Sequence, residues 1–97
     1  MNPDKWNKLS FASQMGNIGS EISRVIYWQE SGDKKNKEDA LWRALELIDL
    51  TARQRKSVEL FRLREAVCDL FFGKNIYKTT VNSLKEYFLQ FSLLANK

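Results

Sequence analysis

The side chains of this sequence that could do chemistry are carboxylates, basic groups and one thiol, because histidine is absent. Without histidine the chain lacks the commonest general base and the commonest metal ligand. Glu46 with Asp49 and Glu65 with Asp69 have the spacing of neighbours on a helix. Helical di-iron sites also need Glu-x-x-His pairs, however, and both carboxylate pairs project onto polar faces. We therefore predict no catalytic residue, no metal site and no cofactor, and expect a protein that is not an enzyme.

The single cysteine, Cys68, has no second cysteine with which to form an intramolecular disulfide or a zinc site. This use of cysteine is typical of a reducing cytoplasm. The first five residues lack the basic region and apolar run of a signal peptide, and no stretch approaches the roughly 20 apolar residues that cross a bilayer. The sequence thus predicts a cytoplasmic protein without a membrane segment.

Basic side chains are densest near the middle of the chain. They are Arg53, Arg55, Lys56, Arg62 and Arg64. Such a cluster can contact a phosphate backbone, although Glu59 and Glu65 dilute its charge. The net charge of +4 and the pI near 9.3 permit binding to nucleic acid without requiring it.

Arg64 has the most constrained position among these basic residues. A helical wheel places it among the apolar side chains of its helix, beside Phe61 and Cys68. A guanidinium group is not stable unpaired in a dry core. We predict that it pairs with a carboxylate or hydroxyl of a neighbouring helix, with Tyr27 and Tyr87 among the candidates. Snorkelling to solvent and facing a ligand pocket are the alternatives.

Helices must position these residues, because apolar side chains recur at the 3.6-residue period in four stretches. The first stretch begins at Asn2–Pro3 or at Ser10, either of which can open a helix. It ends at Gly32, which can serve as a left-handed C-terminal cap. Trp6 and Leu9 fall off the core face of this stretch.

The second stretch follows a solvated connection over residues 33–37. It runs from about Glu38, with Asn36 as its N-cap, to Thr51 or Arg53. The polar break after it leads into the third stretch.

Ser57 can cap the third stretch, which ends at Gly73. A turn over residues 74–80 follows. Ser83 and Glu86 then have capping-box spacing and predict the start of the fourth stretch.

The predicted fold is all-α. Only one proline and four glycines occur, which suits long helices, and the 97 residues are enough for one core but not for two. Short connections favour antiparallel neighbours, so we expect an up-down-up-down antiparallel four-helix bundle forming a single domain over residues 1–97.

Gly16 and Gly19 offer two interpretations. Their Gly-x-x-Gly spacing resembles the loop with which KH domains hold single-stranded nucleic acid, but that fold needs strands around the loop. With Ala12 and Ser23 they form a stripe of small side chains along a helix, which would let another helix approach closely. We expect the helical stripe.

Four apolar residues fall outside the predicted core stripes. Trp42 and Leu50 share the polar flank of the second helix, and Leu89 and Leu93 point away from the core on the fourth. Burying an apolar side chain contributes roughly 1.5 to 3 kcal/mol, so two helices that both expose such residues indicate a contact surface. We predict a noncatalytic interaction module, a homo-oligomer that also docks a protein partner. The alternative is a nucleic-acid-binding component that uses the basic region Arg53 to Arg64.

The segment 64–69 places Arg64 five positions before Asp69 on the third helix. This arrangement resembles the HEPN helical domains, whose ribonuclease members carry an arginine followed a few residues later by a histidine. Asp69 occupies a possible histidine position, so the resemblance implies a noncatalytic member, such as a binding or regulatory partner of a nucleotidyltransferase-like protein. The chain as a whole also resembles small bacterial all-helical families, a resemblance that implies no activity.

Overall fold

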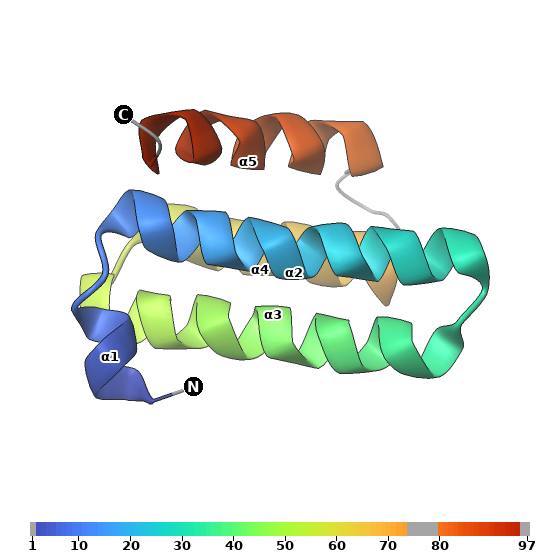
Figure 1. Cartoon of the computed structure of the whole chain (residues 1–97), viewed down its shortest axis with the longest axis horizontal. Helices are drawn as coiled ribbons and strands as arrows, with labels where there is room; N and C mark the ends of the chain where they lie inside the picture. Colours follow the sequence, from blue (N-terminus) through green and yellow to red (C-terminus); the bar gives the residue numbers. More distant parts are fainter. Residues whose placement is uncertain (1, 74–79, 96–97) are drawn as a thin grey trace.

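The computed structural model describes residues 2–73 and 80–95 and confirms the all-helical class (Figure 1). Within these residues there is no strand. The helices are α1 (Pro3–Asn7), α2 (Phe11–Ser31), α3 (Lys34–Arg55), α4 (Val58–Phe71) and α5 (Val81–Ala95).

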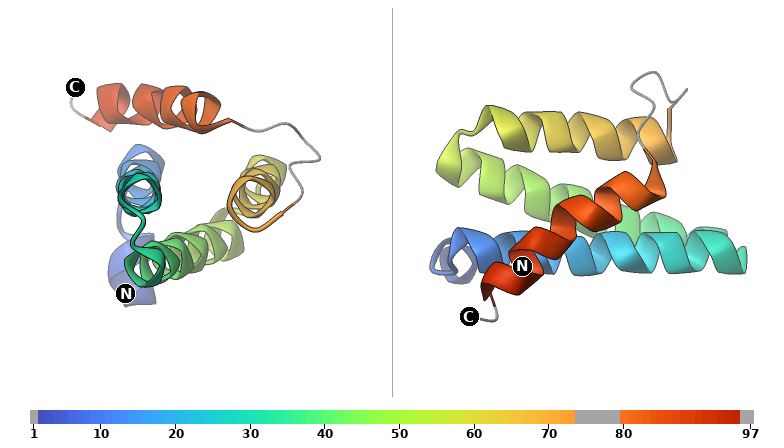
Figure 2. Two further views of the ribbon diagram at one scale, coloured as in Figure 1. Left: turned by 90° about the vertical axis from the view of Figure 1, so that its right-hand side faces the viewer. Right: turned by 90° about the horizontal axis from the view of Figure 1, so that it is seen from above.

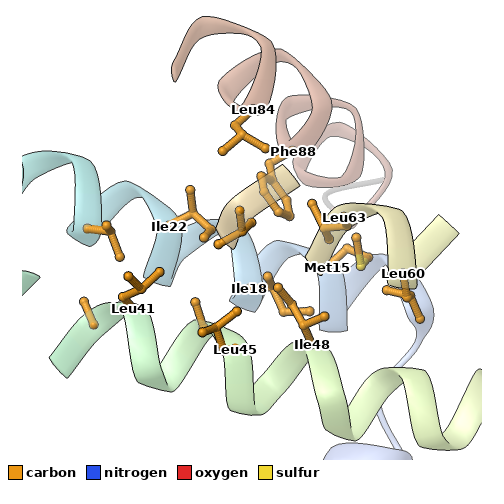
Figure 3. Close-up of a cluster of buried hydrophobic side chains, with 14 of the residues drawn as sticks. Met15, Ile18, Ile22, Leu41, Leu45, Ile48, Leu60, Leu63, Leu84 and Phe88 are labelled. Carbon is orange, nitrogen blue, oxygen red and sulfur yellow. The ribbon is translucent and has the colours of Figure 1, made fainter. Parts of the chain in front are cut away.

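The long helices alternate in direction along the chain, and α2 packs against both α3 and α5 (Figure 1). The helix α5 does not lie alongside the other three but crosses obliquely above them (Figure 2). From this position Leu84 and Phe88 point from α5 toward the other helices, and both belong to the buried core (Figure 3). All five helices contribute to one cluster of buried apolar side chains.

The N-terminal segment forms a helix of its own. Asn2 caps α1, and Ser10 caps α2 by accepting a hydrogen bond from the Ser13 amide. Both predicted helix starts therefore exist, one for each helix. The expectation that Trp6 lies off the core was wrong, because α1 folds back onto α3 and buries the indole completely.

Leu50 was also misplaced by the sequence analysis, since it is 8% exposed and belongs to the core. The physical reason is α1, which a four-helix wheel leaves out. It docks on the C-terminal part of α3, where Gln54 donates a hydrogen bond to the Asn7 carbonyl oxygen at 3.0 Å. The flank of α3 that carries Leu50 is thereby covered.

The second predicted helix begins earlier than expected. Asp33 caps α3 by accepting from the Asn36 amide at 3.1 Å, so the predicted connection over 33–37 is mostly helix. The hydrogen bonds from Asn36 lower the pKa of the Asp33 carboxyl. The predicted caps at Gly32, with φ of 78°, and at Ser57 are both confirmed.

The start of α5 was predicted one turn too late. Thr80 and Ser83 cap it reciprocally, each hydroxyl accepting from the other residue's amide at 3.0 and 3.1 Å. Ser83 is thus the inner member of a capping pair and not its first residue. The predicted turn over 74–80 lies, apart from Thr80, outside the described residues.

The predicted stripe of small residues is where α5 seats on α2. Residues 16–19 are helical, so the KH-like loop was the wrong interpretation. A Cβ atom added at Gly19 would lie 3.0 Å from Cβ and Cγ of Phe88, whereas one added at Gly16 would meet nothing within 4 Å. Gly19 therefore permits the close approach of α5, and Gly16 borders open space.

Candidate interaction surfaces

A row of exposed and partly buried side chains follows the line along which α3 and α4 pack. On α3 its members stand at positions 42, 46, 49 and 53, a spacing that keeps them on one face of a helix. Positions 61, 64, 68 and 72 follow nearly the same spacing on α4. We call this row the seam surface; it comprises Trp42, Glu46, Asp49, Arg53, Phe61, Arg64, Cys68 and Phe72.

Two contacts fix the register of the two helices along the seam surface. The rings of Trp42 and Phe72 lie with centroids 6.0 Å apart, and Arg64 Nε donates to Asp49 Oδ1 at 2.9 Å. The helices are antiparallel, so residue numbers rise along α3 as they fall along α4 (Figure 1).

The register places the remaining members of the seam surface in pairs. Extending these two contacts along the antiparallel helices places Glu46 and Cys68 at the same height along the helix axes, and likewise Arg53 and Phe61. The seam surface is therefore a ladder of four levels, with aromatic rings at both ends and an ion pair near its middle.

The aromatic side chains of this ladder are unusually exposed. Trp42 is 62% exposed, Phe61 61% and Phe72 53%. Large aromatic residues and arginine are the types that most often carry binding energy at protein interfaces. The charges of the ladder balance, because it carries two carboxylates, Glu46 and Asp49, and two guanidinium groups, Arg53 and Arg64. This chemistry suits a protein partner.

Arg64 pairs with a carboxylate, but neither with Tyr27 nor with Tyr87. Its partner Asp49 and its own side chain are 40% and 43% exposed, so the pair lies at the edge of the core. Its Nη1 also lies 3.8 Å from the sulfur of Cys68. The buried pair expected from the sequence is therefore a half-exposed one.

Replacing Arg64 by methionine should cost less than about 1 kcal/mol of unfolding free energy, because half-exposed ion pairs contribute little and Asp49 stays solvated. Urea denaturation measures this cost. Asp49→Asn should give a similar small value, since it removes the same interaction from the other side. A loss of about 3 kcal/mol for Arg64→Met would show that the guanidinium is buried in solution.

Arg64 and Asp69, the residues on which the HEPN resemblance rests, do not share a face. Five residues turn a helix by about 140°. Arg64 accordingly faces the seam, while Asp69 is buried elsewhere. The side chain next to Arg64 on its own face is Cys68.

The basic residues predicted as a phosphate-binding corner are spread over several surfaces. Arg55 turns toward the N-terminal helices, where its Nε donates to the Gln14 amide oxygen at 2.9 Å and its guanidinium lies over the Phe11 ring. Arg62 lines a groove beside α5, and Arg64 belongs to the seam surface. The exposed members are Arg53, Arg55, Lys56 and Arg62.

Leu89 and Leu93 stand one turn apart on the outer side of α5, and each is more than half exposed. We call them the α5 ridge. Because α5 packs mainly on α2, whereas the seam surface follows α3 and α4, the ridge and the seam surface are separate. The four predicted interface residues therefore do not gather: Trp42 lies on the seam, Leu89 and Leu93 form the ridge, and Leu50 is buried.

Two grooves flank α5. The larger, of about 530 Å³, separates it from α4 and has Leu63 and Leu84 among its lining. At this groove the Tyr87 hydroxyl donates to a Glu59 carboxylate oxygen. Burial and this hydrogen bond raise the pKa of Tyr87 far above its usual value, so the phenol stays protonated at neutral pH. The smaller groove, of about 280 Å³, runs between α2 and α5 beside Gly16.

Phe61 and Phe72 are surface residues that were not predicted from the sequence. The available signal was their spacing, since the separations 42 to 53 and 61 to 72 are equal and each keeps one face of a helix. No residues in the described part of the chain group three or more potential metal ligands, and none of its helices is long and apolar enough to cross a membrane. Comparison with known proteins gave no matching family model, curated protein or solved structure.

Proposed function

We propose that this chain is a noncatalytic, cytoplasmic interaction module, in which α2 to α5 form an antiparallel up-down-up-down bundle that self-associates and docks a protein partner. The observation that carries the proposal is the seam surface. Three large aromatic side chains there keep more than half of their area exposed on one face. Exposed aromatic groups aligned in this way gain most from being covered by another protein.

The charges of the seam favour a protein over a nucleic acid. A phosphate backbone is bound by many Lys and Arg side chains acting together. On the seam surface Glu46 and Asp49 offset Arg53 and Arg64. Its ends are aromatic, which suits an apolar contact that tolerates salt.

A second function, nucleic-acid binding by a degenerate HEPN-like component, has one observation in its favour. Arg53, Lys56 and Arg62 are exposed. They border the junction of α3 with α4 and carry charge that phosphate groups would attract. This function predicts binding that weakens steeply with salt.

Exposed apolar side chains occur on two separate surfaces, the seam surface, where aromatic rings flank charged groups, and the α5 ridge. A module that both self-associates and docks a partner needs two such faces. One face would then bind a second copy and leave the other free for the partner.

The proposal is tested by light scattering with two matched variants. The wild-type chain should be larger than the 11.4 kDa of one chain at concentrations on the order of 100 μM. Trp42→Ser with Phe72→Ser should remove apolar area from the seam, and Leu89→Ser with Leu93→Ser from the ridge. Both variants should keep helical circular dichroism, because all four residues are exposed.

The result at high salt separates the two functions. Apolar association should persist at about 1 M salt, where exposed charges are screened beyond a few ångströms. A pull-down from cell lysate at low and at high salt tests for a protein partner. A wild-type chain that is monomeric and retains no protein at either salt concentration would contradict the proposal. Binding to nucleic acid that disappears at high salt, with no self-association, would favour the second function.

A further inference from the structure

We propose that the seam surface binds a second copy of this chain, with α3 of each copy facing α4 of the other across a twofold axis parallel to the seam. This inference rests on the proposed function and specifies one of its partners. In this arrangement the aromatic and charged levels of the seam surface each face a complementary level of the second copy, and no like charges are opposed.

A twofold axis parallel to the two helices exchanges α3 with α4 and leaves each level of the ladder unchanged. Trp42 of one copy then faces Phe72 of the other, and Asp49 faces Arg64. At the far end Arg53 faces the Phe61 ring, a favourable partner for a guanidinium group. Three of the four levels thus meet a chemical complement, and at the fourth Glu46 of one copy faces Cys68 of the other.

The helices that face each other across this interface are antiparallel, because α3 and α4 already run in opposite directions within one chain (Figure 1). Two pairs of antiparallel helices would stack as in a four-helix bundle. Within each copy Asp49 and Arg64 are 2.9 Å apart. In the dimer this pair would lie over the same pair of the other copy with the two charges exchanged. The four charges at this level would then alternate in sign around a square.

A twofold axis across the seam is the competing arrangement. It would place α3 over α3 and α4 over α4. With the axis at the centre of the ladder Asp49 would face Glu46, and with the axis at the ion pair Asp49 would face Asp49 and Arg64 would face Arg64. Either way, like charges would be opposed across the interface, which is strongly unfavourable. The distribution of charge therefore favours the dimer whose twofold axis is parallel to the seam.

The size of the ladder predicts a weak dimer. Twelve residues of helix span about 17 Å, and two helices side by side are about 20 Å wide. This patch is smaller than the roughly 800 Å² that each partner buries in a standard protein complex. We expect weak association, which must therefore be measured at concentrations on the order of 100 μM or above.

Charge reversal at the middle level tests the inference. Asp49→Arg gives each copy two positive groups at this level, and Arg64→Asp gives each copy two negative groups. For each variant alone the association constant of the dimer should fall by tenfold or more, because four like charges would meet at the interface. An equimolar mixture of the two variants should associate, because opposite charges then face each other between copies.

The control is a second ion pair between helices, which joins Arg43 of α3 to Glu21 of α2 at 3.0 Å. Glu21→Arg and Arg43→Glu each break this pair and leave the seam surface unchanged, and Glu21→Arg also breaks the pair of Glu21 with Arg24 within α2. Both should associate as the wild type does, alone and mixed. Circular dichroism checks that all four variants remain helical.

The inference is overturned if the wild type is monomeric at several hundred micromolar, if the seam variants associate as the wild type does, or if their mixture stays monomeric. These failures are distinguishable from failure of the proposed function. A monomeric chain that captures a protein at high salt, and loses it when Trp42 and Phe72 are replaced by serine, keeps the function and rejects the second copy. If the serine variant at Trp42 and Phe72 has the same solution mass as the wild type and captures the same protein, the seam surface has no part in the proposed function or in the dimer.

Discussion

Replacing Trp6 by alanine should destabilise the fold by about 3 to 5 kcal/mol, the usual cost of removing a large buried aromatic side chain. The indole is completely buried, and its Nε1 donates to the Thr51 hydroxyl at 2.9 Å. That hydroxyl in turn donates to the Leu47 carbonyl oxygen at 2.7 Å. The substitution therefore opens a cavity and leaves the fully buried Thr51 hydroxyl without its donor.

Loss of Trp6 should also release α1 from the rest of the protein. A helix of five residues does not form alone, because helix nucleation is unfavourable and is repaid only over a longer helix or by packing. The undocking would uncover Gln14, whose amide nitrogen donates to the Trp6 carbonyl oxygen at 2.8 Å. The effect of one side chain thus extends to the contact between α1 and α2.

Urea denaturation of Trp6→Ala and Trp42→Ala measures this effect with a matched control. Trp42 has the same side chain but is 62% exposed, so its loss should cost less than about 1 kcal/mol in the monomer. Similar costs for the two variants would mean that α1 is not docked in solution.

The helical class could be predicted from the sequence because the four long helices carry clear apolar periodicity. The short helix α1 could not, since five residues do not establish a period. Its docking depends on polar atoms that a helical wheel scores as surface. Gln14 shows this, because it is completely buried and hydrogen-bonded to Trp6 and Gln54. Leu50 was misjudged for the same reason.

The seam surface was predicted only in part. Trp42, Arg53 and Arg64 stood out in the sequence because of their residue types and wheel positions. Phe61 and Phe72 did not, because an aromatic residue next to a core stripe is normally counted with the core. Which residues stand level across α3 and α4 depends on the relative position of two helices along their axes. No spacing within one helix contains that information.

The position of α5 depends on Gly19. Replacing this glycine by leucine should destabilise the fold by about 1 to 3 kcal/mol, the usual cost of overpacking. Even the Cβ atom of the new side chain would lie 3.0 Å from Phe88, whose ring is held in the core. The rest of the leucine side chain has to push α5 away from α2. In a domain of this size each 1 kcal/mol lowers the melting temperature by roughly 4 to 8 °C.

Gly16 provides the control on the same helix, because the space around it is open. Gly16→Ala should stabilise the protein by about 0.5 to 1 kcal/mol, since alanine is preferred to glycine inside a helix. Gly19→Ala should destabilise it, although the helix propensity gain is the same. The two alanine variants therefore differ only in what the methyl group meets, and thermal denaturation should give shifts of opposite sign. Equal upward shifts would show that α5 does not rest on Gly19, and the contact of Phe88 with α2 at this glycine would be contradicted.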